Sequence, residues 1–321
     1  EKFFNSLVFT IIFSKISVKK KIITAEKFDA AAGMSYADAV KIIKEYGFGG
    51  DEKNPEKMIA YETEKFKDFL FEYSPSDKYT KFCLLPLDYH NAEACLRARY
   101  TNVKEENMTA NAGLFGIDEI NGYIDGEKPV SDKALKPLTP CLREGIDEAK
   151  ILFESGKATG VGINVIFTRK LYEEKLKLAK INADLLDIVK TEIDCKNLSG
   201  AIRGRSENYL KEAFINDGYL GFEKVVLLCQ GKQIENAGKY GEWLKTANLS
   251  GLLINFEKEA DGYALNKLAA NKYSCEGFTE FMLVTFYMQN EIKNVRVLTV
   301  GLAGGLDKAE IKSRMRANYA G

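Results

Sequence analysis

The chain has 321 residues, of which 45% are hydrophobic and 29% are charged, a balance typical of a globular protein and not of a disordered one. Its 46 Lys and Arg residues equal its 46 Asp and Glu residues, so the formal net charge is zero. This balance disfavours a nucleic-acid binder, because such proteins carry a basic surplus.

The cysteines and the histidine narrow the chemistry. The six cysteines contain no C-x-x-C pair, which excludes zinc ribbons and thioredoxin-type motifs and predicts buried thiols in a reducing compartment. The single histidine, His90, excludes a metal site that needs two histidines. On a helix, Asp88 would point away from His90, so we interpret His90 as a partly exposed structural residue.

An apolar run from Phe3 to Phe13 is about half the length of a membrane-spanning helix. Lys15 and Lys19 to Lys21 follow this run, whereas a secretory signal places its positive charges before the apolar region. We therefore expect a cytosolic protein, or one docked on a membrane complex from the cytosolic side, without direct membrane insertion.

Helical signals dominate along the chain. Ser35 is placed as the N-cap of a helix that Gly47 would close, and Met58–Tyr73 shows a helical stripe of apolar residues. The longest helical segment is predicted from about Thr168 to Arg203, where two apolar series repeat every seven residues. An N-cap with an acidic third residue predicts a last helix over Asp307–Arg316.

Some short segments are rich in β-branched residues and could be strands by local propensity: 7–18, 161–167, 225–228 and 295–300. We interpret them as helical because of the internal repeat described below, which gives an all-α fold class. The glycines at 301, 304 and 305 lack the spacing of a dinucleotide or phosphate loop, so they predict a turn between two helices.

The most informative feature is a motif that occurs three times. An acid stands three residues before an asparagine, and basic residues follow in each copy. The first copy contains Asp88, Asn91, Arg97 and Arg99, the second contains Asp194, Asn197, Arg203 and Arg205, and the third contains Glu291, Asn294 and Arg296. The asparagines are 106 and 97 residues apart, which is the scale of a domain. The repeat predicts three helical domains over residues 1–107, 108–213 and 214–321.

Helical geometry places the acid and the asparagine on one face, and a residue eleven positions after the acid within about 20° of it. Arg99 and Arg205 occupy that position, whereas the third copy has Leu302. The acid and the base would be about 16 Å apart, so they must reach a neighbouring helix, another repeat or a partner. A site in triplicate favours a structural role over catalysis by the acids.

The three motif copies resemble the C subunit of the V/A-type rotary ATPases, whose eukaryotic counterpart is the d subunit. Residues 14–28 and the helix that Ser35 opens are similar to the start of that family, and Gly305–Ile311 is similar to its end. The resemblance therefore covers nearly the whole chain. Leu302 departs from the family pattern, which usually has a basic residue there.

The resemblance implies three similar domains around a pseudo-threefold axis, forming a funnel. In this family the funnel is a rotor socket, present once per complex on the cytoplasmic face of the membrane. It receives the D and F subunits of the rotor stalk and sits on the c-ring of proteolipid subunits, so that torque drives proton or sodium transport. It binds no cofactor and catalyses nothing. The acid, asparagine and arginine residues of the repeat would then set domain geometry or form an interface.

Two other classes remain open from the residues alone. A helical scaffold or adaptor would share the repeats but not the rotary partners. An intracellular hydrolase or transferase that uses the acids would show turnover and a ligand-binding cleft.

Overall fold

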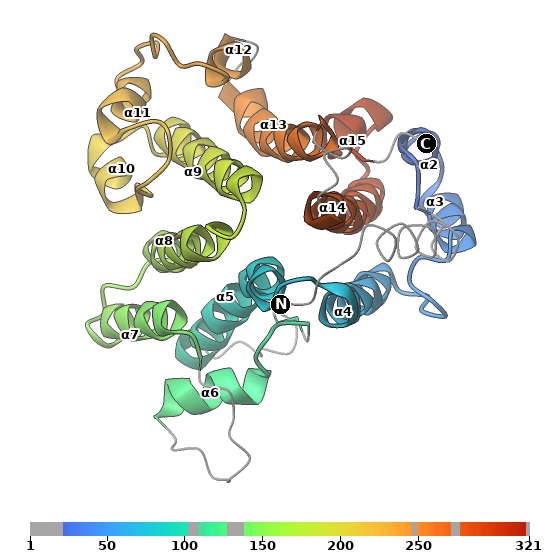
Figure 1. Ribbon diagram of the computed structural model, residues 1–321, viewed down its shortest axis with the longest axis horizontal. Helices are drawn as coiled ribbons and strands as arrows, with labels where there is room; N and C mark the ends of the chain where they lie inside the picture. Colours follow the sequence, from blue (N-terminus) through green and yellow to red (C-terminus); the bar gives the residue numbers. More distant parts are fainter. Residues whose placement is uncertain are drawn as a thin grey trace. The chain divides into compact units, whose positions relative to one another are not determined.

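The computed structural model describes residues 22–101, 109–110, 112–126, 138–245, 249–270 and 277–318. Every regular element in these residues is a helix, which confirms the all-α fold class (Figure 1). The chain divides into two compact units, with unit 1 drawn from residues 1–76 and 237–321 and unit 2 from residues 77–236. The division into three domains at residues 107 and 213 stays a prediction.

Unit 2 is built around two long helices, α5 and α9. Its helices are α5 (Asp77–Thr101), α6 (Ile117–Asp125), α7 (Pro140–Glu154), α8 (Gly160–Ala179), α9 (Ala183–Gly204), α10 (Glu207–Ala213) and α11 (Phe222–Cys229). Helix α8 packs against α5, α7 and α9, and α11 packs against α9. Buried side chains of α5, α6, α7 and α8 form one apolar cluster that holds these helices together.

Unit 1 is built around the long helix α14. Its helices are α2 (Ala25–Ala31), α3 (Tyr36–Glu45), α4 (Pro55–Tyr73), α12 (Tyr240–Lys245), α13 (Leu249–Ala270), α14 (Gly277–Ala303) and α15 (Lys308–Arg314). Helix α14 packs against α3, α4, α13 and α15. One apolar cluster joins residues near both ends of the described chain, from Ile23 to Met315.

The helix boundaries follow local chemistry. The Ser35 hydroxyl accepts a hydrogen bond from the Asp38 N–H (3.2 Å) at the start of α3, and Gly47 follows the helix with φ of 79°. Asp307 forms a capping box at the start of α15. Gly305, with φ of 73°, lies in the turn between α14 and α15, as the sequence predicts.

The segments rich in β-branched residues are helical where they are described. Residues 161–167 lie in α8, 225–228 in α11 and 295–300 in α14, which confirms the helical interpretation. Their side chains gain more from packing into the helical cores than local strand propensity offers, because propensity is a weak preference that tertiary contacts override. Residues 7–18 lie outside the described residues.

The single long helix predicted over Thr168–Arg203 is wrong. Helix α8 ends at Ala179, and α9 begins at Ala183 and packs back against α8. Asn182 starts the new helix, since its Oδ1 accepts a hydrogen bond from the Leu185 N–H (3.0 Å) and so caps α9. The apolar seven-residue series continues across the break because both helices bury the same kind of face.

Replacing Asn182 by alanine is expected to lower the free energy of unfolding by about 1 kcal/mol, because a cap for α9 is lost. Urea unfolding followed by far-ultraviolet circular dichroism measures this loss. Asn182→Asp is the matched control, because aspartate caps equally well and should leave the stability near that of the parent. An equal loss in both variants would contradict the capping role.

The cysteines follow the sequence prediction in the parts of the chain that are described. Cys83, Cys95, Cys141 and Cys195 are buried thiols and Cys229 is half-buried, while Cys275 lies outside the described residues. Burial raises the pKa of Cys83 to about 12, although Tyr79 and Lys175 oppose the shift. His90 is exposed.

Candidate functional site

The acid and the asparagine of each motif copy lie in the middle of a long helix, on α5, α9 and α14. All six side chains are at most 2% exposed: Asp88, Asn91, Asp194, Asn197, Glu291 and Asn294. Buried polar groups require hydrogen-bond partners, because an unpaired group loses its hydration without compensation. Their partners therefore indicate what the motif does.

Each asparagine binds the backbone of one residue in a downstream loop with two hydrogen bonds. The N–H of Ala110 donates to Asn91 Oδ1 (2.8 Å), and Asn91 Nδ2 donates to the Ala110 carbonyl oxygen (2.7 Å). Asn197 makes the same pair with Ile215, at 2.9 and 2.8 Å.

The third copy repeats this geometry. The N–H of Arg316 donates to Asn294 Oδ1 (2.7 Å), and Asn294 Nδ2 donates to the Arg316 carbonyl oxygen (3.0 Å). The amide side chain matches the donor and acceptor of a single residue, which explains why asparagine and not a carboxylate occupies this position.

Each acid accepts hydrogen bonds from backbone N–H groups, and in the first two copies the donors lie four or five residues after the residue that the asparagine binds. Asp88 Oδ1 accepts from Phe115 (3.1 Å). Asp194 accepts from Tyr219 through Oδ2 and from Leu220 through Oδ1, both at 3.0 Å.

In the third copy, Glu291 Oε1 accepts from the N–H of Ile23 (2.9 Å), which belongs to a distant part of the chain. Hydrogen bonds to an ionised carboxylate are stronger than those between neutral groups. The repeated pair therefore fastens a loop to its long helix in the first two copies and two separate segments, near Ile23 and Arg316, to α14 in the third.

Two glycines outside the acid–asparagine motif also belong to this site. A Cβ atom at Gly113 would lie 2.2 Å from Asp88 Oδ1, and one at Gly218 would lie 2.2 Å from Asp194 Oδ1. Only glycine lets the loop backbone approach the carboxylate this closely. The signal was present in the sequence, because each glycine stands three residues after the residue that the asparagine binds.

The basic residues do not share these contacts. Arg97 pairs with Glu93 (2.5 Å) and donates to the Gly160 carbonyl oxygen (2.8 Å), while Arg99 pairs with Asp125. The acids thus bind loop backbone and not a base eleven positions on.

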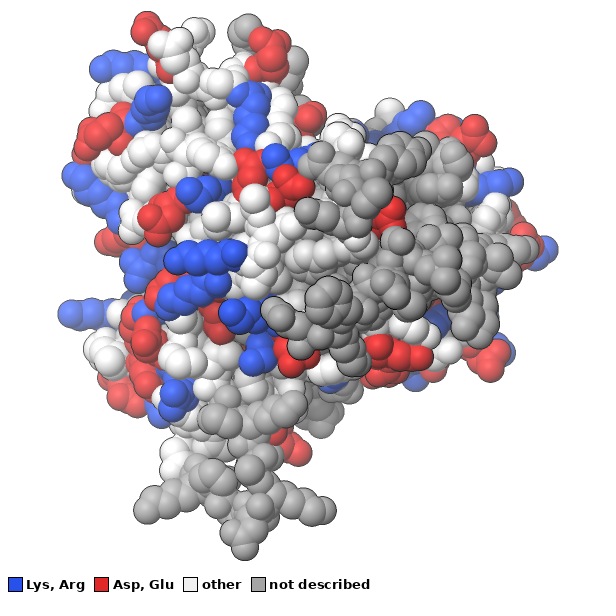
Figure 2. Space-filling model, in the orientation of Figure 1, with Lys and Arg blue, Asp and Glu red and all other residues white. Residues whose placement is uncertain are grey.

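The expected column of acid, amide and base on one helix is wrong in the second copy. Helix α9 ends at Gly204, and Arg205 is its C-cap in the left-handed conformation, with φ of 44°. Arg203 is exposed, and Arg296 is an exposed residue 3.7 Å from Glu56 in unit 1. Basic and acidic side chains are interspersed on the face shown in Figure 2.

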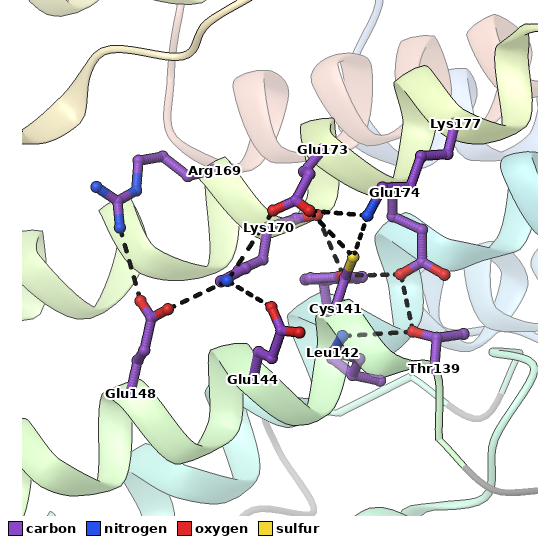
Figure 3. A network of polar contacts seen from close by, with 11 residues as sticks. Thr139, Cys141, Leu142, Glu144, Glu148, Arg169, Lys170, Glu173, Glu174 and Lys177 are labelled. Carbon is purple, nitrogen blue, oxygen red and sulfur yellow. Dashed lines mark hydrogen bonds and ion pairs between the residues drawn. The ribbon is translucent and has the colours of Figure 1, made fainter.

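A second group of polar contacts joins α7 to α8 in unit 2 (Figure 3). Lys170 Nζ lies 2.7 Å from a carboxylate oxygen of Glu144 and 3.1 Å from one of Glu148. Burial lowers the pKa of Lys170, but the hydrogen bonds to the two carboxylates outweigh it and raise the pKa overall. These contacts lie beside the apolar cluster that packs α7 on α8, and they add little to it because both carboxylates are exposed to water.

The buried carboxylate of this group has structural partners. Glu174 accepts from the Tyr89 hydroxyl and from Thr139 Oγ1, each at 2.8 Å, and so connects α8 to α5 and to the start of α7. Cys141 lies 3.3 Å from Lys177 Nζ. Burial raises the pKa of Cys141 above its ordinary value despite this lysine, which keeps it a thiol and not a nucleophilic thiolate.

None of the helices in the described parts of the chain is long and apolar enough to cross a membrane. Within the same parts, no group of three or more His, Cys, Asp and Glu residues could hold a metal ion.

These features define a helical-repeat protein whose recurring polar residues fasten loops to its long helices. The chain belongs to the ATP synthase (C/AC39) subunit family, since the model of this family matches residues 16–314. It is similar to the C subunit of the V-type sodium ATPase of Enterococcus hirae, with 22% identity over 296 residues that cover 87% of each chain. These comparisons confirm the resemblance drawn from the motifs, and the family is an accessory part of the ATPase and not a catalytic one.

Proposed function

We propose that this chain is the non-catalytic central-rotor subunit of a V/A-type ATPase or ATP synthase. It links the D and F subunits of the stalk to the membrane c-ring and transmits torque for proton or sodium transport. The observation that carries this proposal is the family match over residues 16–314, together with the similarity to the C subunit of a V-type ATPase over most of both chains.

The structure supports a torque-bearing role through the way in which its loops are held. A part that transmits torque must resist local deformation, and long loops are normally the most mobile parts of a helical protein. Here the segment that leads into α6 and the loop between α10 and α11 are held by buried hydrogen bonds from Asp88, Asn91, Asp194 and Asn197. The repeat motif therefore stiffens each domain and sets its geometry.

The same proposal places one copy of the protein in each complex, on the cytoplasmic face of the membrane, without a cofactor or nucleic-acid partner. Recovery of the tagged chain from gently solubilised native membranes tests it. Mass spectrometry should find the A, B, D, F and proteolipid subunits in one particle, and the isolated chain should lack ATPase activity. A partnerless monomer under conditions that preserve other complexes would favour a helical adaptor without a rotary role.

Asp194→Ala tests the role of the motif. We expect faster amide exchange in residues 215–220 and a joint loss of stalk and ring partners, because two backbone N–H groups lose their acceptor. Glu223→Ala, which removes an exposed carboxylate of α11, is the matched control and should change neither readout. A normally folded Asp194→Ala variant that loses the ring alone would instead identify Asp194 as a ring contact.

A further inference from the structure

The acid of each motif copy binds the same place relative to a short helix. In the first two copies its last N–H donor, Phe115 or Leu220, immediately precedes the N-cap of α6 or α11. In the third copy the donor is Ile23, and Thr24 after it is the N-cap of α2. Helix α2 thus occupies the position in the third copy that α6 and α11 occupy in the other two.

The apolar side chains of the short helices follow the same register. Five residues after each donor stands a side chain that is at most 2% exposed, namely Ile120 in α6, Val225 in α11 and Phe28 in α2. Because the equivalence covers the hydrogen bond, the cap and the buried side chain, it rests on three independent features of each short helix.

The copies differ in how the chain connects these parts. In the first two, the donor follows the residue held by the asparagine by five positions, from Ala110 to Phe115 and from Ile215 to Leu220. In the third, the asparagine holds Arg316, whereas Ile23 comes from the opposite side of the sequence. A side chain replaces the missing peptide connection, since Asn318 Nδ2 donates to the Ile23 carbonyl oxygen (2.8 Å).

We propose that the third copy is a permuted repeat, closed by a clasp of Ile23, Asp29, Glu291, Lys312 and Asn318, and that the clasp opens locally while unit 2 stays folded. In the first two copies a continuous loop keeps the short helix beside its acid. In the third copy the described contacts of α2 with α14 and α15 are non-covalent, and a short turn joins α2 to α3, so α2 can move away from α14 and α15 while α3 stays packed on α14.

The contacts of the clasp differ in strength. The buried hydrogen bond from Ile23 to Glu291 contributes most, because its loss leaves a buried N–H group unpaired. The ion pairs of Asp29 with Lys312 (2.6 Å) and Lys308 (3.4 Å) are partly exposed to water and contribute little. Opening would uncover apolar side chains of α14 and α15, to which Ile23 and Phe28 now pack.

Hydrogen exchange with mass spectrometry on the full chain tests the clasp. Glu291→Met keeps the length of the side chain but removes the acceptor, and Asn318→Ala removes the other link at a half-buried position. We expect exchange in residues 22–32 to accelerate about tenfold or more in Glu291→Met and in the same direction in Asn318→Ala, with residues 77–126 unchanged. Asp194→Leu is the matched control and should accelerate residues 215–226 but not residues 22–32.

Two outcomes would overturn the proposal. Unchanged exchange in residues 22–32 in both variants would mean that these contacts do not hold α2. A uniform acceleration over residues 22–76 and 277–318 would mean that unit 1 opens as a whole and contains no separate clasp. Should Glu291→Met fail to fold, Asn318→Ala still distinguishes these outcomes, because it removes a link of the clasp without replacing a fully buried residue.

Discussion

Replacing Asn197 by alanine is expected to lower the free energy of unfolding by about 2–6 kcal/mol, because the N–H and the C=O of Ile215 both lose their partner while buried. An unpaired buried backbone group costs about 1–3 kcal/mol, and this substitution creates two of them. The asparagine itself is only 2% exposed, so water cannot replace it without a rearrangement of the loop.

The loss must be assigned to unit 2. The single tryptophan, Trp243, lies in unit 1, so its fluorescence reports on unit 1 and not on the unit that contains Asn197. Urea unfolding followed by far-ultraviolet circular dichroism gives the total change, and amide exchange of residues 193–220 locates it. Asn164→Ala is the control, because Asn164 is exposed and makes only a 3.4 Å contact with Glu93. A stability change in Asn197→Ala no larger than in this control would show that the paired hydrogen bonds contribute little.

The parts of the fold that follow from local chemistry could be predicted from the sequence. The N-caps at Ser35 and Asp307 and the glycine that ends α3 depend on residues within one turn of each other, so a short window contains the whole signal. The break between α8 and α9 was missed because an apolar period continues through Asn182. Periodicity reports which face is buried, and two packed helices can share one period.

The repeat motif could be found from the sequence, but its partners could not. A buried asparagine can pair with any backbone group, and no residue type at the partner position is required. The role of Gly113 and Gly218 could be predicted from the sequence, since the segments that contain them are similar in sequence from Ala110 and Ile215 onward.

The clasp, in contrast, could not be predicted from the sequence. Ile23 and Glu291 are 268 positions apart. An alignment of the residues that follow each motif runs toward the C-terminus, so it cannot match Ile23 to the third copy. Only the folded chain brings the two segments together, so this part of the third copy had to come from the structure.

Gly218→Ala is expected to lower the free energy of unfolding by about 2–4 kcal/mol, because the new methyl group would overlap Asp194 Oδ1 at 2.2 Å and displace the loop from its hydrogen bonds. The φ angle of Gly218 is not positive, so the close approach and not backbone strain carries the effect. Gly262→Ala in α13, where nothing lies within 4 Å, is the control and should raise stability by about 0.5–1 kcal/mol.

A double-mutant cycle with Asp194→Ala identifies the contact responsible. If the methyl group acts by colliding with the carboxylate, Gly218→Ala should cost much less once that carboxylate is absent, and the two losses should not add. Additive losses would instead place the collision at the neighbouring Ile193 side chain, 3.1 Å from the same position. Gly218 would then be needed because of its contact with Ile193 and not because of Asp194, and it would not belong to the repeat motif.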